Sequence, residues 1–282
     1  MINFDEVYEK PVLVGQGGCG EVYRLKNKET GEYVALKIMD NKQVWESEKK
    51  ILTQADHPLF PAFIDADEDE GKYYILMEYI WGENLASVLM RRKGLAQAEA
   101  MRMALTIADG IGWLQTKDNP AIFRDLKAEN IVLTPEGDVR LVDFGSACGL
   151  YDKDKAITGT AGVSAPEQFE GEAGLYSDVY AFGKLFHFML TGINPSQNEN
   201  KKLIPLYEFD PMLSYLLELL IEDCIGTLPE DRLPDMYCVT QRMVEIASQT
   251  PRSYKKMEKL AKKEIERRAG ESEIAFEKNI RK

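Results

Sequence analysis

Residues 121–130, AIFRDLKAEN, place four charges in a short polar loop directly before the apolar run 131–133. Any exposed turn between two strands can have this composition. An aspartate such as Asp125 can also accept a proton from a hydroxyl group, and Lys127 can neutralise charge on a transferring phosphoryl group. The loop is therefore either a solvated turn or the floor of an active site, and the surrounding sequence has to distinguish the two.

The composition is typical of a folded soluble protein. The chain has 282 residues, 44% of them hydrophobic, which allows one large domain with two lobes or two modest domains. No run approaches the roughly 18 consecutive apolar residues of a membrane helix, and the N-terminus lacks the features of a signal peptide. The net charge of −12 argues against broad nucleic-acid binding. We therefore expect a cytoplasmic enzyme, with any membrane tether outside this chain.

The cysteines do not form a metal-binding or redox pattern. They show no CxxC spacing, and the two histidines cannot supply a metal cluster. Inert free thiols in a reducing compartment are therefore expected at all four positions. These positions are Cys19, Cys148, Cys224 and Cys238.

The order of strand-like and helix-like segments predicts an α+β fold with two lobes. Residues 11–40 contain β-branched and aromatic runs, a short helix follows at 41–55, and residues 62–80 suggest a strand, an acidic turn and a strand. Helical patterns then dominate, including a segment at 178–192 that is apolar nearly all round and so is expected to be buried. The prediction is a small β-rich lobe followed by a larger helical lobe.

Four glycines lie between the first two strand-like runs, at Gly15, Gly17, Gly18 and Gly20. A G-x-G-x-x-G pattern lets backbone amides approach phosphates, because no Cβ stands in the way. A dinucleotide-binding fold would need a helix directly afterwards, but a strand follows here. The pattern favours a glycine-rich hairpin folded over a nucleotide, although such hairpin turns also occur without a ligand.

Lys37 ends the apolar strand VALK, and a buried ammonium group is costly unless it meets an anion. A phosphate would satisfy it, with Glu48 on the next helix holding the ammonium in place; the alternative is a lysine that extends from the strand edge into solvent. Asp143 follows another strand, at a Phe-Gly turn that can expose its carboxylate. Together with Asn130 it offers the oxygen ligands that Mg²⁺ prefers.

The order and spacing of these motifs resemble the protein kinase family over roughly residues 8–248. The resemblance implies binding of ATP and Mg²⁺, with Asp125 as catalytic base, Lys127 and Lys37 acting on the phosphates, and Asn130 and Asp143 holding the metal. It also implies a set of nucleotide contacts from the glycine loop, the lysine strand, the hinge and the strand after the catalytic loop. These are Val14, Gly15, Gln16, Gly17, Gly18, Cys19, Gly20, Val22, Ala35, Lys37, Glu48, Met77, Glu78, Ile80, Asn84 and Leu133.

Three downstream residues extend the resemblance. Glu167, in the sequence Ala-Pro-Glu at 165–167, matches the end of the family's activation segment, and Arg232 resembles the arginine that pairs with it. Asp178 resembles the aspartate that anchors the catalytic loop. We therefore expect these residues to hold the two loops of the active site in place.

The spacing of Lys127 from Asp125, with Gly-Thr at 159–160, is the family's Ser/Thr pattern rather than its tyrosine pattern. The resemblance thus implies transfer of the γ-phosphoryl group of ATP to Ser or Thr of a protein substrate, with autophosphorylation. The string APEQF is similar to bacterial members of the eukaryotic type. A nucleotide-binding pseudokinase scaffold and a small-molecule kinase remain the alternatives.

Three features depart from the family pattern. Phe123 stands where a histidine is usual, and we expect it to stack on Phe144, in line with Leu52, without loss of activity. The tip of the glycine loop has Gly18 and Cys19 where an aromatic residue often shields the phosphates. Glu48 lies only 11 positions after Lys37, a shorter interval than usual, which leaves a weaker candidate for the ion pair at 46, a glutamate.

Arg124, beside the catalytic base, is expected to need an anion from the activation segment. A phosphate on Thr158 is one source, and the carboxylates of Asp152 and Asp154 are the other. We favour Thr158, because it lies just before the Gly-Thr element, whereas a phosphate on Thr160 would block the substrate.

The expected domain covers residues 1–248, with a small lobe at about 1–77, a hinge at 78–82 and a large lobe at 83–248. A charged, basic helical tail follows at 249–282. From residue 252 onward, 11 Lys and Arg residues face 6 Glu, a net +5 that leaves −17 on the rest. The tail is either a solvated terminal helix or a basic segment that approaches a membrane or an acidic partner. The sequence leaves the substrate and the oligomeric state open.

Overall fold

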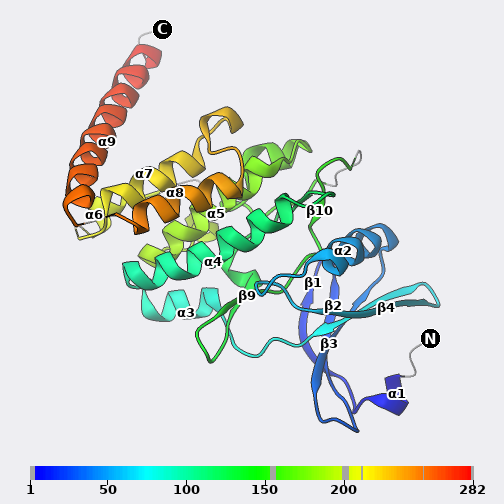
Figure 1. Ribbon diagram of the computed structural model, residues 1–282. Coiled ribbons are helices and arrows are strands. Elements are labelled where there is room, and N and C mark those ends of the chain that lie inside the picture. The colour runs from blue at the N-terminus through cyan, green and yellow to red at the C-terminus, as the bar shows by residue number, and fades with distance from the viewer. Residues whose placement is uncertain (1–3, 153–156, 199–202, 211, 250, 281–282) are drawn as a thin grey trace.

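A computed structural model describes residues 4–152, 157–198, 203–210, 212–249 and 251–280. A small lobe built around one β-sheet is joined to a larger, mainly helical lobe (Figure 1). The predicted α+β, two-lobed fold is confirmed.

The small lobe is a five-stranded antiparallel sheet in the order β1-β2-β3-β5-β4. Its strands are β1 (Val12–Gly17), β2 (Gly20–Lys26), β3 (Tyr33–Met39), β4 (Phe63–Asp69) and β5 (Lys72–Glu78), and a short helix α1 (Phe4–Val7) precedes them. The β4–β5 turn contains Glu70 and Gly71, both with positive φ (47° and 78°), which is the backbone that a two-residue hairpin turn requires. The predicted strand–acidic turn–strand is thus correct.

Helix α2 (Lys42–Gln54) begins where the sequence predicts it. The side chain of Asn41 accepts hydrogen bonds from the amides of Gln43 and Val44, so the first turn has a polar cap. Trp45, Glu48, Ile51 and Leu52 form the buried face of the helix. This face brings Glu48 towards the sheet and Leu52 towards the large lobe.

The large lobe consists of helices with short strands at the boundary with the small lobe. Its helices are α3 (Leu85–Arg92), α4 (Gln97–Gln115), α5 (Leu175–Thr191), α6 (Leu206–Phe209), α7 (Tyr215–Ile225), α8 (Met236–Ala247) and α9 (Pro251–Ile280). Its strands are β6 (Glu83–Asn84), β7 (Ala121–Ile122), β8 (Ile131–Leu133), β9 (Val139–Leu141) and β10 (Cys148–Gly149), paired as β6-β8-β9 and β10-β7. Thirteen of the 17 residues of α5 are buried, as its apolar sequence predicts.

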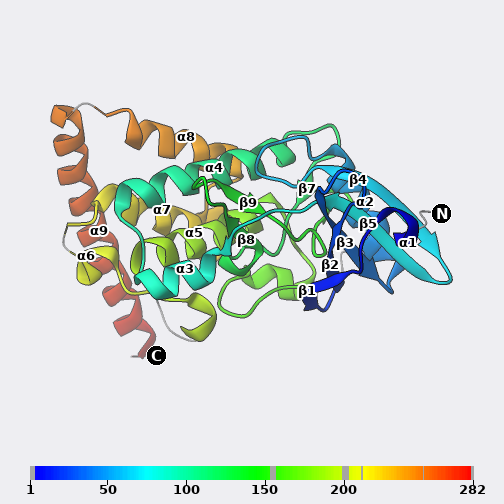
Figure 2. The same cartoon turned by 90° about the horizontal axis from the view of Figure 1, so that it is seen from below.

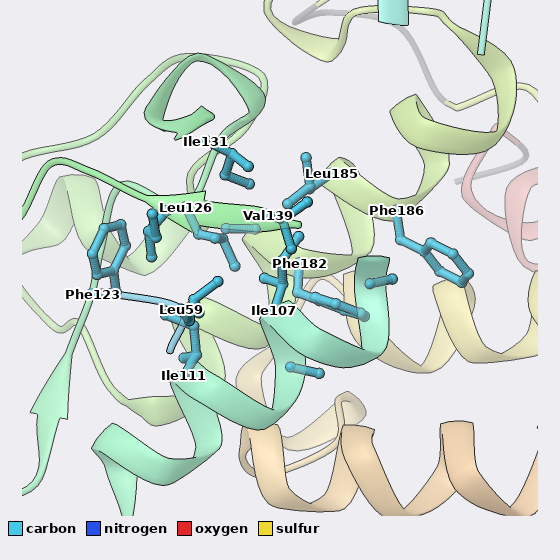
Figure 3. Close-up of a cluster of buried hydrophobic side chains, with 14 of the residues drawn as sticks. Leu59, Ile107, Ile111, Phe123, Leu126, Ile131, Val139, Phe182, Leu185 and Phe186 are labelled. Atoms are coloured by element: carbon cyan, nitrogen blue, oxygen red, sulfur yellow. The ribbon is translucent and has the colours of Figure 1, made fainter. Parts of the chain in front are cut away.

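The core of the large lobe reaches the catalytic loop without interruption. Side chains from α4, α5 and β9 pack against Phe123 and Leu126, which belong to the stretch 121–130, and against Ile131, which follows it (Figure 3). All three side chains have no exposed surface. The apolar residues of that stretch therefore anchor it in the core of the large lobe.

Helix α9 packs on the end of the large lobe that is farthest from the small lobe (Figures 1 and 2). The carboxylate of Glu258 accepts hydrogen bonds from the Ser214 hydroxyl and, at 3.0 Å, from the amide of Tyr215. It thereby caps the N-terminus of α7. Arg268 forms ion pairs with Glu222 (3.2 Å) and Asp223 (3.1 Å) near the other end of α7. No helix in the described ranges is both long and apolar enough to cross a membrane.

The substitution Glu258→Ala should lower the free energy of unfolding by about 1 kcal/mol, because α7 loses a cap at its first turn. The measurement is urea-induced unfolding followed by circular dichroism. Glu266→Ala is the matched control, since Glu266 is an exposed glutamate on the same helix. Equal losses in the two variants would contradict the capping role.

Candidate active site

The glycine loop is the turn of the β1–β2 hairpin. Gly17 pairs with Gly20, so Gly18 and Cys19 form its tip. Gly20 has φ +132°, and a Cβ there would lie 2.2 Å from the carbonyl oxygen of Ile38, so only glycine fits. The tip folds inward: a Cβ on Gly145 would lie 2.7 Å from the Cys19 sulfur. The hairpin therefore covers the end of the cleft where Asp143 lies, as the sequence predicts for a loop folded over a nucleotide.

Lys37 joins the two lobes at the back of the cleft. Its ammonium lies 2.7 and 2.8 Å from the two carboxylate oxygens of Glu48 and 2.8 Å from Oδ1 of Asp143. Burial alone would lower the pKa of Lys37, but the two carboxylates outweigh it and raise the pKa, so the group stays charged. The same ammonium holds the pKa of Asp143 below its usual value, against the effect of burial. Glu48, rather than the glutamate at 46, forms the pair, despite the short interval.

The catalytic loop brings together three polar residues of the stretch 121–130, namely Asp125, Lys127 and Asn130. Asn130 donates from Nδ2 to the backbone oxygen of Asp125 and to its Oδ2, both at 2.9 Å. Lys127 lies 2.8 Å from the same Oδ2. The hydroxyl of Thr160 donates to the other oxygen, Oδ1, at 3.0 Å and accepts from Lys127 at 3.1 Å. Asn130, Lys127 and Thr160 thus hold the carboxylate of Asp125 in place. A substrate hydroxyl would lie beside these residues.

A buried carboxylate on α5 positions this loop. Asp178 has no exposed surface. Its two oxygens accept hydrogen bonds from the backbone amides of Phe123 (2.9 Å) and Arg124 (2.8 Å). Gln115 donates a third hydrogen bond, at 3.0 Å. Arg124 has φ +67°, an unfavourable backbone conformation for a non-glycine residue. The two hydrogen bonds from the amides to Asp178 hold it in this conformation. The predicted anchoring role has a direct geometric basis.

Phe123 packs as the sequence predicts. Its ring lies edge-on to that of Phe144, with centroids 5.4 Å apart, and Phe144 in turn meets Phe60 at 5.2 Å. Leu52 is 1% exposed and belongs to the same buried cluster. The ring of Phe123 therefore fills an apolar position against Phe144, the residue that follows Asp143.

Two oxygen atoms are available for a metal ion in the positions that the sequence predicts. Asn130 uses its amide nitrogen for Asp125, and its Oδ1 makes no hydrogen bond within the described residues. Oδ1 of Asp143 accepts hydrogen bonds from the ammonium of Lys37 and from the amide of Gly145. Its Oδ2 makes no hydrogen bond within the described residues. In the part of the chain that the structure describes, no three His, Cys, Asp or Glu side chains form a metal-ligand group. Two oxygen ligands fit Mg²⁺ that is held jointly with phosphates.

The apolar residues expected around adenine come from strands on both sides of the hinge. Ala35 and Met77 are buried and face each other on β3 and β5, while Val22 and Leu133 are half-buried and Val14 is 45% exposed. Ile80, also expected there, is half-buried after β5. The hydrophobic residues of the expected nucleotide site therefore lie on or beside strands of both lobes, from β1, β2, β3 and β5 to β8.

Two polar residues of the expected nucleotide site are engaged within the protein. The side chain of Asn84 caps α3 by accepting from the amides of Ala86 and Ser87, and its nitrogen donates to the backbone oxygen of Glu129. Gln16 donates to Glu21 at 3.0 Å across the hairpin. Both therefore support the elements around the cleft.

Arg140 is a structural residue of the hinge that the sequence did not reveal. Its guanidinium lies 2.6 Å from the carboxylate of Glu78 and 2.8 Å from the backbone oxygen of Phe60. Glu78 also makes two hydrogen bonds with the backbone of Ala62. Its amide donates to the Ala62 oxygen (2.9 Å), and its carboxylate accepts from the Ala62 amide (3.1 Å). The strand that leads to Asp143 is thereby tied to the hinge. A basic residue in an apolar strand was the only signal.

The activation segment is held by an ion pair and an amide. Arg232 binds both carboxylate oxygens of Glu167, at 2.7 and 3.0 Å, so the predicted pair is present and is bidentate. Gln168 donates to the backbone oxygens of Arg124 (2.8 Å) and Thr158 (3.2 Å). The end of the segment is thus joined to the catalytic loop.

The candidate anions for Arg124 lie at different places. The Thr158 hydroxyl is 3.2 Å from that of Ser146, whose backbone oxygen accepts from Arg124 at 2.5 Å. The carboxylate of Asp152 accepts from the amide of Gly149 at 2.7 Å, and Asp154 lies outside the described residues. Thr158 is therefore one residue away from the group that Arg124 already contacts.

All four cysteines are free, as predicted. Burial raises the pKa of Cys224, and burial also raises that of Cys19 although Lys37 opposes it. Raised pKa values keep these thiols protonated and weakly reactive.

The pKa of Asp178 is raised to about 6 by burial, although its three N–H donors oppose the shift. Between about pH 4 and pH 6 the folded chain keeps a proton that the unfolded chain has lost, so this group lowers the free energy of unfolding as pH rises. The variant Asp178→Asn lacks the titration. The stability of the native protein relative to this variant should therefore fall over that range, by up to about 3 kcal/mol. Urea unfolding at a series of pH values measures the difference, and a flat difference would contradict the shift.

The chain matches known proteins over most of its length. The family model described as "Protein kinase domain" matches residues 8–270. A RAC family serine/threonine-protein kinase homolog of Dictyostelium discoideum is 31% identical over 79% of this chain and 54% of its own length. The cAMP-dependent protein kinase catalytic subunit PRKX of Homo sapiens is 33% identical, over 68% and 56%.

The receptor-like kinase LIP2 of Arabidopsis thaliana is 35% identical over 66% of this chain and 36% of that protein. The chain thus spans about half the length of the first two relatives and less of the third. With the family model covering almost the entire chain, and with Lys37 joined to Asp143 and Asn130 joined to Asp125, the chain belongs to the protein kinase family.

Proposed function

We propose that the chain is a Ser/Thr protein kinase, which transfers the γ-phosphoryl group of ATP to a protein hydroxyl. The observation that carries this proposal is the threonine hydroxyl at Thr160, which donates to Asp125 and accepts from Lys127. The catalytic carboxylate is thus already placed to accept a proton from an aliphatic hydroxyl.

Nucleotide binding would use the cleft between the lobes. Ala35, Met77 and Leu133 offer apolar surface to adenine, and the hairpin that carries Gly17 offers backbone amides to the phosphates. Lys37 would contact the phosphates from its place beside Glu48. Asn130 and Asp143 would hold Mg²⁺, which neutralises phosphate charge when bound.

The chemical step requires the protein to orient a hydroxyl and to take its proton. Asp125 would accept the proton while the hydroxyl oxygen bonds to the γ-phosphorus and the bond from that phosphorus to the β,γ-bridging oxygen breaks. ADP leaves with the electron pair of the broken bond. Lys127, 2.8 Å from the aspartate, would steady the negative charge on the transferring group.

A pseudokinase scaffold and a small-molecule kinase are the alternatives. The complete set of Lys37, Asp125, Asn130 and Asp143, each within hydrogen-bond distance of another member or of Glu48, argues against the scaffold. Residues 157–167, which end at the Glu167–Arg232 pair, support a polypeptide substrate rather than a small molecule, because Thr160 in this range lies against Asp125.

The direct test is transfer of labelled phosphate from ATP with Mg²⁺ to dephosphorylated casein and to the chain itself. Asp125→Asn should lower the rate at least 100-fold, the order of magnitude for loss of a positioned general base. Asp118→Asn, a substitution of the same kind at an exposed site, should leave it unchanged. ATP binding is measured separately by calorimetry. ATP binding without transfer in the unsubstituted chain would support the scaffold instead.

A second experiment concerns Thr158. We expect mass spectrometry of the autophosphorylated chain to find phosphate on this residue, because a phosphate there would lie beside Ser146 and could pair with Arg124. Thr158→Ala should lower the transfer rate about tenfold, the effect of roughly one charge-assisted hydrogen bond. Thr53→Ala is the control at an exposed threonine. An unchanged rate with Thr158→Ala would remove the role of this residue.

A further inference from the structure

Helix α9 carries five lysines on one face of its first half, and the proposed kinase activity does not use them. With about 100° between successive residues of an α-helix, these positions fall within an arc of about 120°. All five are exposed. They are Lys255, Lys256, Lys259, Lys262 and Lys263, called here the α9 basic face.

The opposite face of α9 is the one that packs on the large lobe. Ala261 and Ile265 are 3% and 4% exposed, and Tyr254 and Met257 pack against the same core. The apolar side of the helix is therefore already buried, and the five lysines lie on the opposite, exposed side. Within residues 253–270, where the structure describes the side chains, the helix has no second apolar face with which it could enter a membrane.

The positive charge of the basic face is not balanced locally. Within the described residues none of the five lysines forms an ion pair, and Lys262 only lies over the ring of Tyr215, at 5.6 Å. The one acidic residue among positions 252–263 is Glu258, whose carboxylate caps α7. The exposed Glu266 marks the end of the face. Five uncompensated cations thus gather on an otherwise acidic protein.

We propose that the α9 basic face binds an anionic lipid surface. The face consists of lysines, which act as point charges, and has none of the arginines that favour bidentate recognition. It has no aromatic side chain of α9 itself for stacking on bases, and only Leu260, 57% exposed, lies at its edge. It lacks the buried aromatic or apolar anchors around which specific protein interfaces form. A cluster of positive charges without a shaped pocket is suited to the negative surface of a lipid bilayer, which attracts it without specific contacts.

The position of α9 is compatible with activity on such a surface. The helix lies at the end of the large lobe remote from the small lobe, so a bilayer beside it would leave the boundary between the two lobes uncovered (Figure 2). The acidic remainder of the chain would be repelled by the same bilayer. The attraction and this repulsion together orient the protein with α9 towards the lipid. Binding of this kind is reversible and weakens as salt screens the charges.

The test is sedimentation of the full chain with vesicles of phosphatidylcholine alone and of phosphatidylcholine containing one third phosphatidylglycerol. We expect binding to the anionic vesicles only, and its loss in high salt. The triple variant K255Q/K256Q/K259Q should bind at least tenfold more weakly, because each lysine near an anionic surface contributes about fivefold. Glutamine preserves helix propensity, and the variant's thermal unfolding and kinase rate are measured alongside.

The matched control, K10Q/K28Q/K50Q, makes the same change in charge at exposed lysines of the small lobe and should bind like the unsubstituted chain. Failure to bind anionic vesicles, equal losses in the two triple variants, or binding that survives high salt would each overturn the proposal. Polyglutamate and duplex DNA are tested in parallel. If either binds as tightly as the vesicles and through the same three lysines, the partner is an acidic macromolecule and not a lipid. None of these outcomes depends on phosphoryl transfer.

Discussion

The active site depends on one carboxylate that solvent does not reach. Asp178, in the first turn of α5, accepts the two amides that begin the catalytic loop and so fixes the left-handed backbone of Arg124. Burial makes ionisation of this group unfavourable, and the unfavourable backbone at Arg124 adds of order 1 kcal/mol. The surrounding core compensates for both, because α5 is buried along nearly its whole length. Stability is thus given up so that Asp125 is held in one position.

The start of α5 organises both loops that meet at the site. Ser177, next to Asp178, donates to Glu167 at 2.7 Å, and Glu167 is the residue held by Arg232. Two neighbouring residues on one helix turn therefore reach the catalytic loop and the end of the activation segment. Gln168 closes the arrangement with its bond to the backbone oxygen of Arg124. Displacement of either loop would break contacts with the other, so the two are expected to order together.

The sequence predicts those parts of this arrangement that have a fixed local pattern. The glycine hairpin, the Lys37–Glu48 pair and the loop that carries Asp125 follow from spacing together with the family resemblance, and the structure has them. The link between Glu78 and Arg140 could not be predicted, since it joins residues 62 positions apart whose types are ordinary for strand edges. The use of Asn84 as a helix cap is unpredictable for a similar reason. Its amide has several possible partners, and the fold selects among them.

Phe123 shows how a departure from a family pattern can leave the backbone contacts of the loop intact. The contribution of this position to the loop is its backbone amide, which donates to Asp178 whatever the side chain. The side chain itself has no exposed surface and meets the ring of Phe144, and an imidazole there would need a polar partner in an apolar cluster. Phenylalanine avoids that requirement and adds an edge-to-face contact worth about 1 kcal/mol. Because Phe144 precedes Gly145 in the turn that carries Asp143, the contact stabilises the turn in the observed position. The phenylalanine at position 123 therefore acts on the placement of Asp143.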